Sequence, residues 1–251
     1  MLASTRRTEL RRAEQAWEDA LADAVPQARP ALEPQSPAPS GSLLPLREQV
    51  YEALSLLHVP AAPKLIATVH EAFFGSTFPT TRVTSLKRDE ERSFRTSPFA
   101  RPYYICAALS ADYLSPSRGL LAVSTWPLER RVIGSLSPRV DFLTAAIRVA
   151  DAIERIPAPP LAARRLLQRF AASIPGAAPT SQTTLTSASP DQVRPDVVRQ
   201  AADAELSVHA DADSRMRKEA ADRARRQLGD AEQLFGAKLR PVTDETGTDA
   251  G

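Results

Sequence analysis

The chain has 251 residues, 43% of them hydrophobic, which is enough for one core, while its 22 prolines favour a smaller core with linkers. With 32 Lys and Arg against 30 Asp and Glu, the net charge is +2, which excludes a protein that binds nucleic acid through its overall charge. Basic surfaces therefore have to be sought locally.

The N-terminal segment predicts a helix followed by a linker. Residues 1–25 carry a narrow apolar stripe at helical spacing, formed by Leu10, Trp17 and Leu21. Such a stripe cannot fold alone and requires a partner surface. Five prolines from Pro26 to Pro39 then predict an extended linker over 26–45.

Regularly spaced apolar residues begin at residue 46, and a core is predicted over 46–156. Apolar residues three and four apart indicate helices, and short runs rich in β-branched and aromatic residues indicate two strands of a hairpin. Pro60 and Gly75 are expected to end the first two helices, and a hydroxyl of Thr80 or Thr81 is expected to cap the third. The predicted elements are helices over 46–59, 63–74 and 80–94, strands over 102–109 and 119–126, and a helix over 138–156.

The segments after residue 156 are expected to be peripheral. Residues 157–175 predict a short basic helix, and 176–190 a disordered linker rich in Thr, Ser and Pro. Residues 191–240 predict a long charged helix with few large apolar residues and no heptad repeat, followed by a disordered tail over 241–251. The fold class is therefore mainly α with a small β-hairpin, flanked by helices and linkers.

The order of elements over 46–156 resembles that of winged helix-turn-helix DNA-binding proteins. The resemblance covers less than half of the chain and rests on element order, since helix-turn-helix signatures are mainly apolar spacing. In this family the third helix lies in the major groove, and the tip of the hairpin, called the wing, contacts the DNA backbone or minor groove. The resemblance implies DNA contacts from Thr80, Thr81, Arg82, Ser85, Lys87, Arg88 and Arg92 on the helix and from Ser115, Ser117 and Arg118 on the wing.

The residue types of this third helix suit DNA, with one reservation. Threonine hydroxyls and helix N-terminal amides suit phosphate oxygens, and arginine reaches guanine edges through two hydrogen bonds. The basic face is interrupted by three acids, of which the adjacent pair Asp89 and Glu90 is expected to be solvated, followed by Glu91. These acids do no harm along the back of the helix, but they weaken the interpretation if they share the arginine face.

Two departures from the family pattern concern the turn before the third helix and the segment after it. The turn from Gly75 to Thr80 is longer than a tight helix-turn-helix turn, and no glycine follows the third helix before the first strand. The competing interpretation is a small helical core whose exposed helix happens to be basic.

The search for catalytic motifs is mostly negative. No Gly-rich phosphate loop or nucleophile motif is present in the sequence, which has nine glycines. The run HEAFF begins like a zinc-protease motif, but Phe74 occupies the place of the second histidine. Three distant histidines and one cysteine argue against a metal site, and Cys106 is expected to be a buried apolar side chain in a strand. We predict neither an enzyme nor a cofactor.

The sequence thus predicts a bacterial, cytoplasmic double-stranded DNA-binding protein that regulates transcription. Its 28 arginines against 4 lysines are typical of a GC-rich bacterial genome. The lone cysteine, the absence of a long apolar run and the charged N-terminus favour the cytoplasm over export or a membrane. The alternative is a non-enzymatic adaptor or scaffold that binds protein partners, which is favoured if the arginine face is acidic or covered by the N-terminal helix.

The flanking helices are predicted to pair with a second copy of the chain, because one winged helix covers only a few base pairs. The contacts expected are the N-terminal stripe together with Ile147, Ile153, Leu228, Leu234 and Phe235. The competing interpretation is that the N-terminal stripe folds back onto the core of its own chain.

Overall fold

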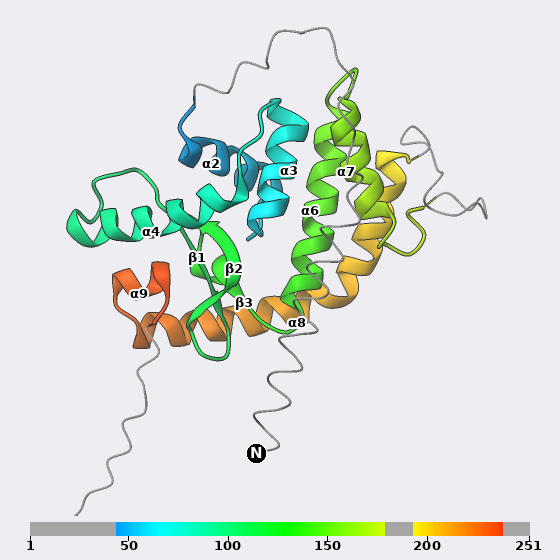
Figure 1. The fold of residues 1–251 in the computed structure, drawn as a ribbon. Helices are drawn as coiled ribbons and strands as arrows, with labels where there is room; N and C mark the ends of the chain where they lie inside the picture. Colours follow the sequence, from blue (N-terminus) through cyan, green and yellow to red (C-terminus); the bar gives the residue numbers. More distant parts are fainter. Residues whose placement is uncertain (1–43, 179–192, 238–251) are drawn as a thin grey trace, which may run out of the picture. The chain divides into compact units, whose positions relative to one another are not determined.

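The computed structural model describes residues 44–178 and 193–237, all within the compact unit Ser40–Gly251 (Figure 1). The predicted N-terminal helix, the tail over 241–251 and most of the two linkers lie outside the described residues. Within the described ranges, no helix is long and apolar enough to cross a membrane.

Three helices open the described chain, as predicted: α2 (Leu46–Leu57), α3 (Pro63–Phe74) and α4 (Thr80–Thr96). α2 ends where His58 adopts a left-handed conformation (φ 62), two residues before Pro60. α3 ends at Gly75, whose φ of 77 suits a residue without a Cβ. α4 begins after Pro79 without a side-chain cap, so the predicted threonine cap is wrong.

The predicted hairpin is confirmed as β1 (Ile105–Ser110) paired antiparallel with β2 (Pro116–Val123). Its connecting turn is shorter than predicted, because β2 begins at Pro116 rather than at residue 119. A short helix, α5 (Leu128–Arg131), leads into β3 (Val132–Ile133), which pairs parallel with β1 and was not predicted. The fold is thus mainly helical with a small sheet of order β2-β1-β3.

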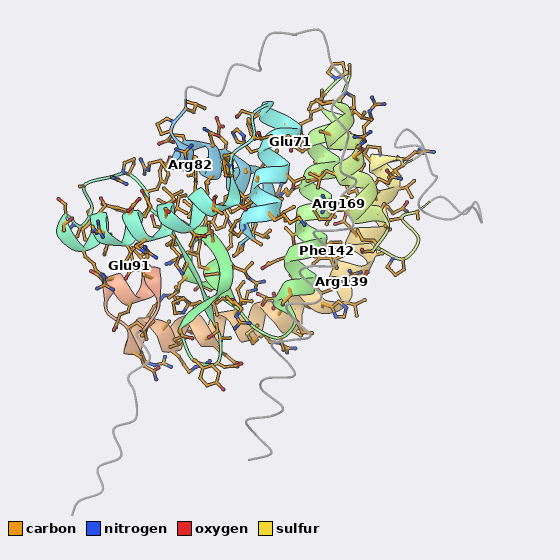
Figure 2. The ribbon with its side chains drawn as sticks, in the orientation of Figure 1. Glu71, Arg82, Glu91, Arg139, Phe142 and Arg169 are labelled. Atoms are coloured by element: carbon orange, nitrogen blue, oxygen red, sulfur yellow. The ribbon has the colours of Figure 1, made fainter. Side chains whose placement is uncertain are left out.

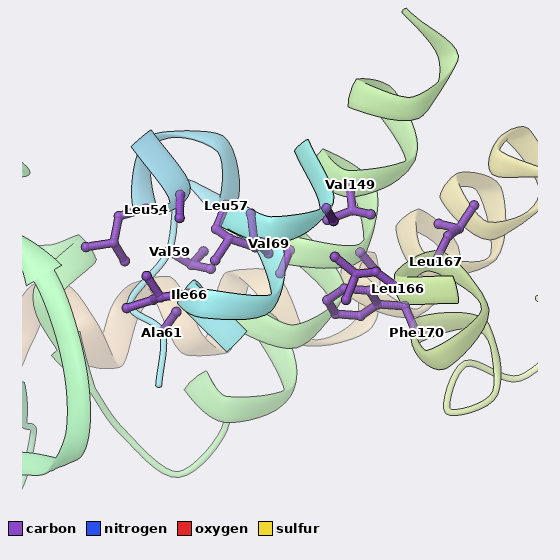
Figure 3. Packing of buried hydrophobic residues seen from close by; sticks show 14 of the residues in the cluster. Leu54, Leu57, Val59, Ala61, Ile66, Val69, Val149, Leu166, Leu167 and Phe170 are labelled. Carbon is purple, nitrogen blue, oxygen red and sulfur yellow. The ribbon is translucent and has the colours of Figure 1, made fainter. Parts of the chain in front are cut away.

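The loop between α2 and α3 is tied to the hairpin. Ala61 and Leu121 each donate a backbone hydrogen bond to the other's carbonyl, at 3.0 Å in both directions. The inward face of β2 joins the same hydrophobic core as Leu54 of α2 and Ile66 of α3 (Figure 3). This bridge and the shared core hold the first helices against one face of the hairpin.

The core continues past residue 156 through α6 (Ser137–Glu154), α7 (Leu161–Ala171), α8 (Pro195–Gln227) and α9 (Asp230–Phe235). α8 runs alongside α6 and beneath the sheet to α9 (Figure 1). The core that holds Leu54 also contains Leu166, Leu167, Phe170, Val198 and Ala202 (Figure 3). The predicted end of the core at Ile156, with peripheral helices beyond it, is therefore wrong.

α8 has a buried face although its sequence consists mostly of alanine and charged residues. Ala220, Ala221 and Ala224 are fully buried against Leu109, Leu128 and Val132, which belong to the sheet and to α5. Interhelical distance depends on the side chains at the contact, and alanine lets backbones approach. It contributes little to an apolar pattern, so the sequence gives no strong sign of this face.

Several residues that were predicted to pair with a second copy pack in the hydrophobic clusters of their own chain. Ile153 and Phe235 are only 4% and 3% exposed, and Ile147 packs against the main core. Leu228 and Leu234 pack against the smaller clusters beneath the sheet and beside α9. These side chains therefore contribute to packing within the folded chain, and pairing with a second copy stays a prediction.

A buried ionic cluster also joins α6 to α8. The Arg217 guanidinium donates to Asp213 Oδ2 and to Asp141 Oδ1, both at 2.6 Å. Ser137 Oγ donates to Asp213 Oδ1 at 2.6 Å. Burial raises the pKa of Asp141 to about 6, with Asp213 adding to the rise and Arg217 opposing it.

We expect the wild type to lose stability relative to the Asp141→Asn variant as pH rises from about 4 to about 7. The folded chain holds the Asp141 proton more tightly than the unfolded chain, where the carboxyl has its ordinary pKa of 3.8. Stabilisation by this proton is thus complete below about pH 4 and lost above about pH 6. The shift corresponds to on the order of 3 kcal/mol in the free energy of unfolding.

Urea denaturation across this pH range measures the effect. The exposed Asp112→Asn variant is the matched control, because it removes a carboxylate that makes no ion pair within the described ranges. Parallel stability curves for the wild type and Asp141→Asn would contradict the assignment.

Candidate nucleic-acid interface

α4 has one face in the core and one face in solvent. Val83 and Phe94 are buried, with exposures of 1% and 3%. Phe94 meets the ring of Tyr104 edge-on at a centroid distance of 5.2 Å, and the ring of Phe235 in α9 lies 5.9 Å away. The helix is therefore held near both ends by apolar contacts.

Glu90 lies between these two contacts, on the inner face of α4, and is 1% exposed. Its Oε2 accepts the backbone N–H of Ile105 at 3.0 Å, and its Oε1 is bound by the Arg101 guanidinium. Arg47 Nε lies 3.4 Å from the same Oε1, without hydrogen-bond alignment. One carboxylate thus joins α4 to α2, to the loop before β1 and to β1 itself, and the prediction that Glu90 is solvated is wrong.

An aromatic group extends this network to the start of α2. Arg47 donates to the Tyr103 carbonyl at 2.8 Å and lies 4.6 Å from the centre of the Tyr103 ring. Tyr51 stacks on the same ring at 4.2 Å, and the Tyr103 hydroxyl donates to Glu48. Burial raises the pKa of Tyr103, and the hydrogen bond to the Glu48 carboxylate adds to the rise.

The outer face of α4 carries most of the predicted DNA-contacting residues. Exposed side chains are Thr80, Thr81, Arg82, Ser85, Arg88 and Arg92, whereas Lys87 is half-buried at the edge of the helix. At about 100° per residue, Arg88 projects about 40° from Arg92, and Arg82 about 80° from it on the other side. The three arginines span about 15 Å along the axis. In the described part of the chain, none of them forms an ion pair.

The three acids of α4 are placed differently from one another. Glu90 is buried, as described above. Glu91, which is labelled on α4 in Figure 2, accepts from Arg95 one turn later, at 2.9 and 3.1 Å, so the charges of this pair cancel. Asp89 is exposed and lies about 20° from the line of Arg82, two turns away. The exposed face therefore carries three unpaired cations against one carboxylate.

The hairpin tip is only in part the free wing that the resemblance implies. The Ala111 carbonyl accepts from Arg223 of α8 at 2.7 Å, and the Leu114 carbonyl accepts from the Ala237 amide at 3.2 Å. The Ser115 carbonyl is bound by the Ser110 amide at 2.9 Å, so it closes the turn.

The predicted wing residues beyond the turn differ in exposure. Ser117 is half-buried, and Arg118 is exposed without an ion-pair partner among the described residues. Arg118 lies near the tip, whereas Glu90 of α4 contacts Ile105 at the opposite end of β1. The register places Arg118 opposite the stretch between Ala107 and Leu109, about 7–13 Å along the strand from that contact.

The prediction that Cys106 is a buried side chain in a strand is confirmed. Its side chain is fully buried under α9, and burial raises the pKa of the thiol, opposed by Arg131, whose Nη1 lies 3.9 Å from Sγ. Among the residues that the structure describes, no group of three His, Cys, Asp or Glu side chains is arranged to hold a metal ion.

Four residues that fix α4 were not predicted from the sequence: Arg47, Glu90, Arg101 and Tyr103. A signal for Glu90 was present in its position. It lies seven residues after Val83 and four before Phe94, on the apolar stripe of the helix. A charged residue at such a position is buried when it has partners, but the partners come from distant segments and had no local signature.

Comparison of the chain with protein-family models, with curated proteins and with solved structures finds no match.

We expect Glu90→Gln to destabilise the fold by about 3 kcal/mol, because it removes the buried charge that compensates Arg101 and leaves Arg47 paired with Glu48 alone. Glu91→Gln is the matched control, since it makes the same chemical change one residue away in an exposed pair worth about 0.5 kcal/mol. Urea denaturation of both variants gives the comparison. Equal losses of stability would show that Glu90 does not hold α4 in place.

Proposed function

We propose that this protein binds double-stranded DNA through the exposed face of α4 and acts as a regulator of transcription. The observation that supports the proposal is how the charged side chains of α4 are distributed between its buried and exposed faces. Glu90 is buried and Glu91 is paired, while Arg82, Arg88 and Arg92 stand exposed and unpaired within the described chain. Unpaired cations on a rigid helix provide both attraction for phosphates and donors for base edges.

The arrangement around α4 supports a winged helix-turn-helix reading of the domain. The order of α2, α3, α4 and the β1–β2 hairpin is that of the family. The Ala61–Leu121 bridge holds the first helices on the hairpin, and Glu90 ties α4 to the start of β1. α4 is thereby fixed with its outer face free of the core.

The dimensions of α4 suit the major groove. The groove is about 12 Å wide and admits a single α-helix. The arginines occupy about 15 Å of the helix axis, so they face about four or five base pairs at about 3.4 Å per pair. Thr80 and Thr81 at the N-terminus suit phosphate oxygens. The exposed Asp89 is compatible with this mode, because a carboxylate accepts from the amino group of cytosine.

A second candidate is an adaptor that binds a protein partner. The observation in its favour is an exposed aromatic residue before α4 in the chain and another after it. Phe74 at the end of α3 is 43% exposed, and Phe99 in the loop after α4 is 75% exposed. The partial covering of the hairpin tip by α8 and the residues after α9 also removes part of the usual second DNA contact.

The triple variant Arg82→Gln, Arg88→Gln and Arg92→Gln is expected to bind duplex DNA at least about 100-fold more weakly, since each lost contact costs about 1–3 kcal/mol. Its stability should change by no more than about 0.5 kcal/mol per site, because the three side chains are exposed. Fluorescence anisotropy with a pool of random duplexes, at about 50 and 200 mM salt, measures the affinity and its salt dependence.

The control is Arg165→Gln, Arg169→Gln and Arg226→Gln, which removes the same charge from exposed positions on α7 and α8. If the protein binds DNA and both triple variants bind as the wild type does, α4 is not the interface. If the wild type itself does not bind at low salt, the adaptor candidate takes precedence.

A further inference from the structure

A groove of about 430 Å³ lies where α3, α6 and α7 meet. Its volume falls within the range of about 300–1,000 Å³ typical of small-molecule sites. No lining residue belongs to α4, β1 or β2, so the groove is separate from the proposed DNA interface.

The floor of the groove is apolar and is contributed by all three helices. Leu65 comes from α3, Phe142 from α6, and Leu166 and Phe170 from α7. The rings of Phe142 and Phe170 lie 5.1 Å apart at an angle of 50°. Leu166 and Phe170, labelled in Figure 3, are 3% and 4% exposed, whereas Leu65 and Phe142 are only half-buried. The groove therefore leaves apolar surface in contact with water, and a ligand with an apolar body would cover it.

One cation stands at the rim of this apolar floor. Among the described residues that line the groove, Arg169 is the one charged side chain. It is exposed, labelled in Figure 2, and makes no ion pair within the described ranges. Leu166, Phe170 and Ser173 lie one, three or four residues from Arg169 and line the same groove. A guanidinium at this place can bind a carboxylate whose apolar part rests on the floor.

The charges next to the groove are already paired. Arg139 lies 5.1 Å from the centre of the Phe142 ring and donates two hydrogen bonds to Glu205, at 2.5 and 2.6 Å. Asp141, which precedes Phe142 in the chain, is bound by Arg217. These pairs leave the charge of Arg169 uncompensated, so the groove as a whole favours an anion with a single charge.

The end of α7 carries a partial negative charge that opposes an anion, but its carbonyls are occupied. The carbonyls of Gln168 and Phe170 accept from the amides of Ala172 and Ser173, both at 3.0 Å. The carbonyl of Ser173 accepts from Arg139 at 3.0 Å. The hydroxyl of Ser173 has no hydrogen-bond partner in the described part of the chain and can donate to a ligand in the groove.

We propose that this groove binds a small aromatic carboxylate, with its carboxylate on Arg169 and Ser173 and its ring against Leu65 and Phe142. The single negative charge matches the single unpaired cation. An aromatic body suits the floor, because pairs of aromatic rings attract one another beyond the area that they bury. The site stands independently of DNA binding by α4.

Calorimetric titration of the full chain near pH 7 with three compounds tests both parts of the proposal. 3-Phenylpropionate has the ring and the carboxylate, 3-phenylpropan-1-ol has the ring alone, and propionate has the carboxylate alone. We expect 3-phenylpropionate to bind at least about fivefold more tightly than either analogue, since only this compound makes the charge-assisted hydrogen bond and covers the floor. Equal affinity for the acid and either analogue, or no binding of the acid at about 10 mM, would overturn the proposal.

The Arg169→Gln variant locates the carboxylate. Its affinity for 3-phenylpropionate is expected to fall to the level of the alcohol, while its affinity for the alcohol stays as in the wild type. Arg165→Gln is the matched control, because Arg165 lies one turn earlier on α7, is also exposed and does not line the groove. Equal losses in the two variants, or no loss in Arg169→Gln, would refute the assignment.

The Ala172→Trp variant locates the ring. Ala172 lines the groove, is exposed and has right-handed helical backbone angles, so a large side chain fits there without backbone strain and fills the groove. We expect this variant to bind both the acid and the alcohol at least about fivefold more weakly. Unchanged affinity for both compounds would place them outside the groove.

Discussion

The position of α4 depends on one buried carboxylate. Glu90 takes the backbone amide that opens β1, the guanidinium of Arg101 from the loop before it and the positive charge of Arg47 from α2. These groups come from β1, from the loop before it and from α2, so the contacts around the Glu90 carboxylate form only when all of these segments are in place. Removing the Glu90 charge takes the buried counter-charge from Arg101 and leaves Arg47 with Glu48 alone, which makes the arrangement costly to alter.

The burial of Glu90 also determines which side chains α4 exposes to solvent. Because Arg88 and Arg92 lie two residues before and after Glu90, they project from the face opposite to it. Arg82 lies two turns before Asp89, on the same side of the helix as Asp89. Packing of Phe94 on Tyr104 and Phe235 secures the other end of the helix. A helix held this firmly adds little backbone ordering to the cost of binding, and only the exposed arginine side chains themselves have to be ordered.

Apolar spacing predicted α2, α3, α4 and the hairpin within a few residues, because each buries one face on a common core. The same reasoning predicted the helix of α8 but not its packing into the core, since Ala220, Ala221 and Ala224 are buried but give little hydrophobic signal. It also failed for the three acids of α4. Adjacent charged residues look alike in sequence, and only the distant partners of Glu90 distinguish it from its neighbours. The candidate interface was thus predicted by residue type, but the constraint that orients it was not.

If the outer face of α4 contacts DNA, as we propose, titration with a short duplex will shift the backbone amide resonances of this helix in NMR spectra. We expect the largest changes between residues 80 and 92, with smaller ones near Arg118, and we expect them to weaken as salt is raised. Amide shifts confined to other elements, or an α4 whose resonances do not move at low salt, would contradict it.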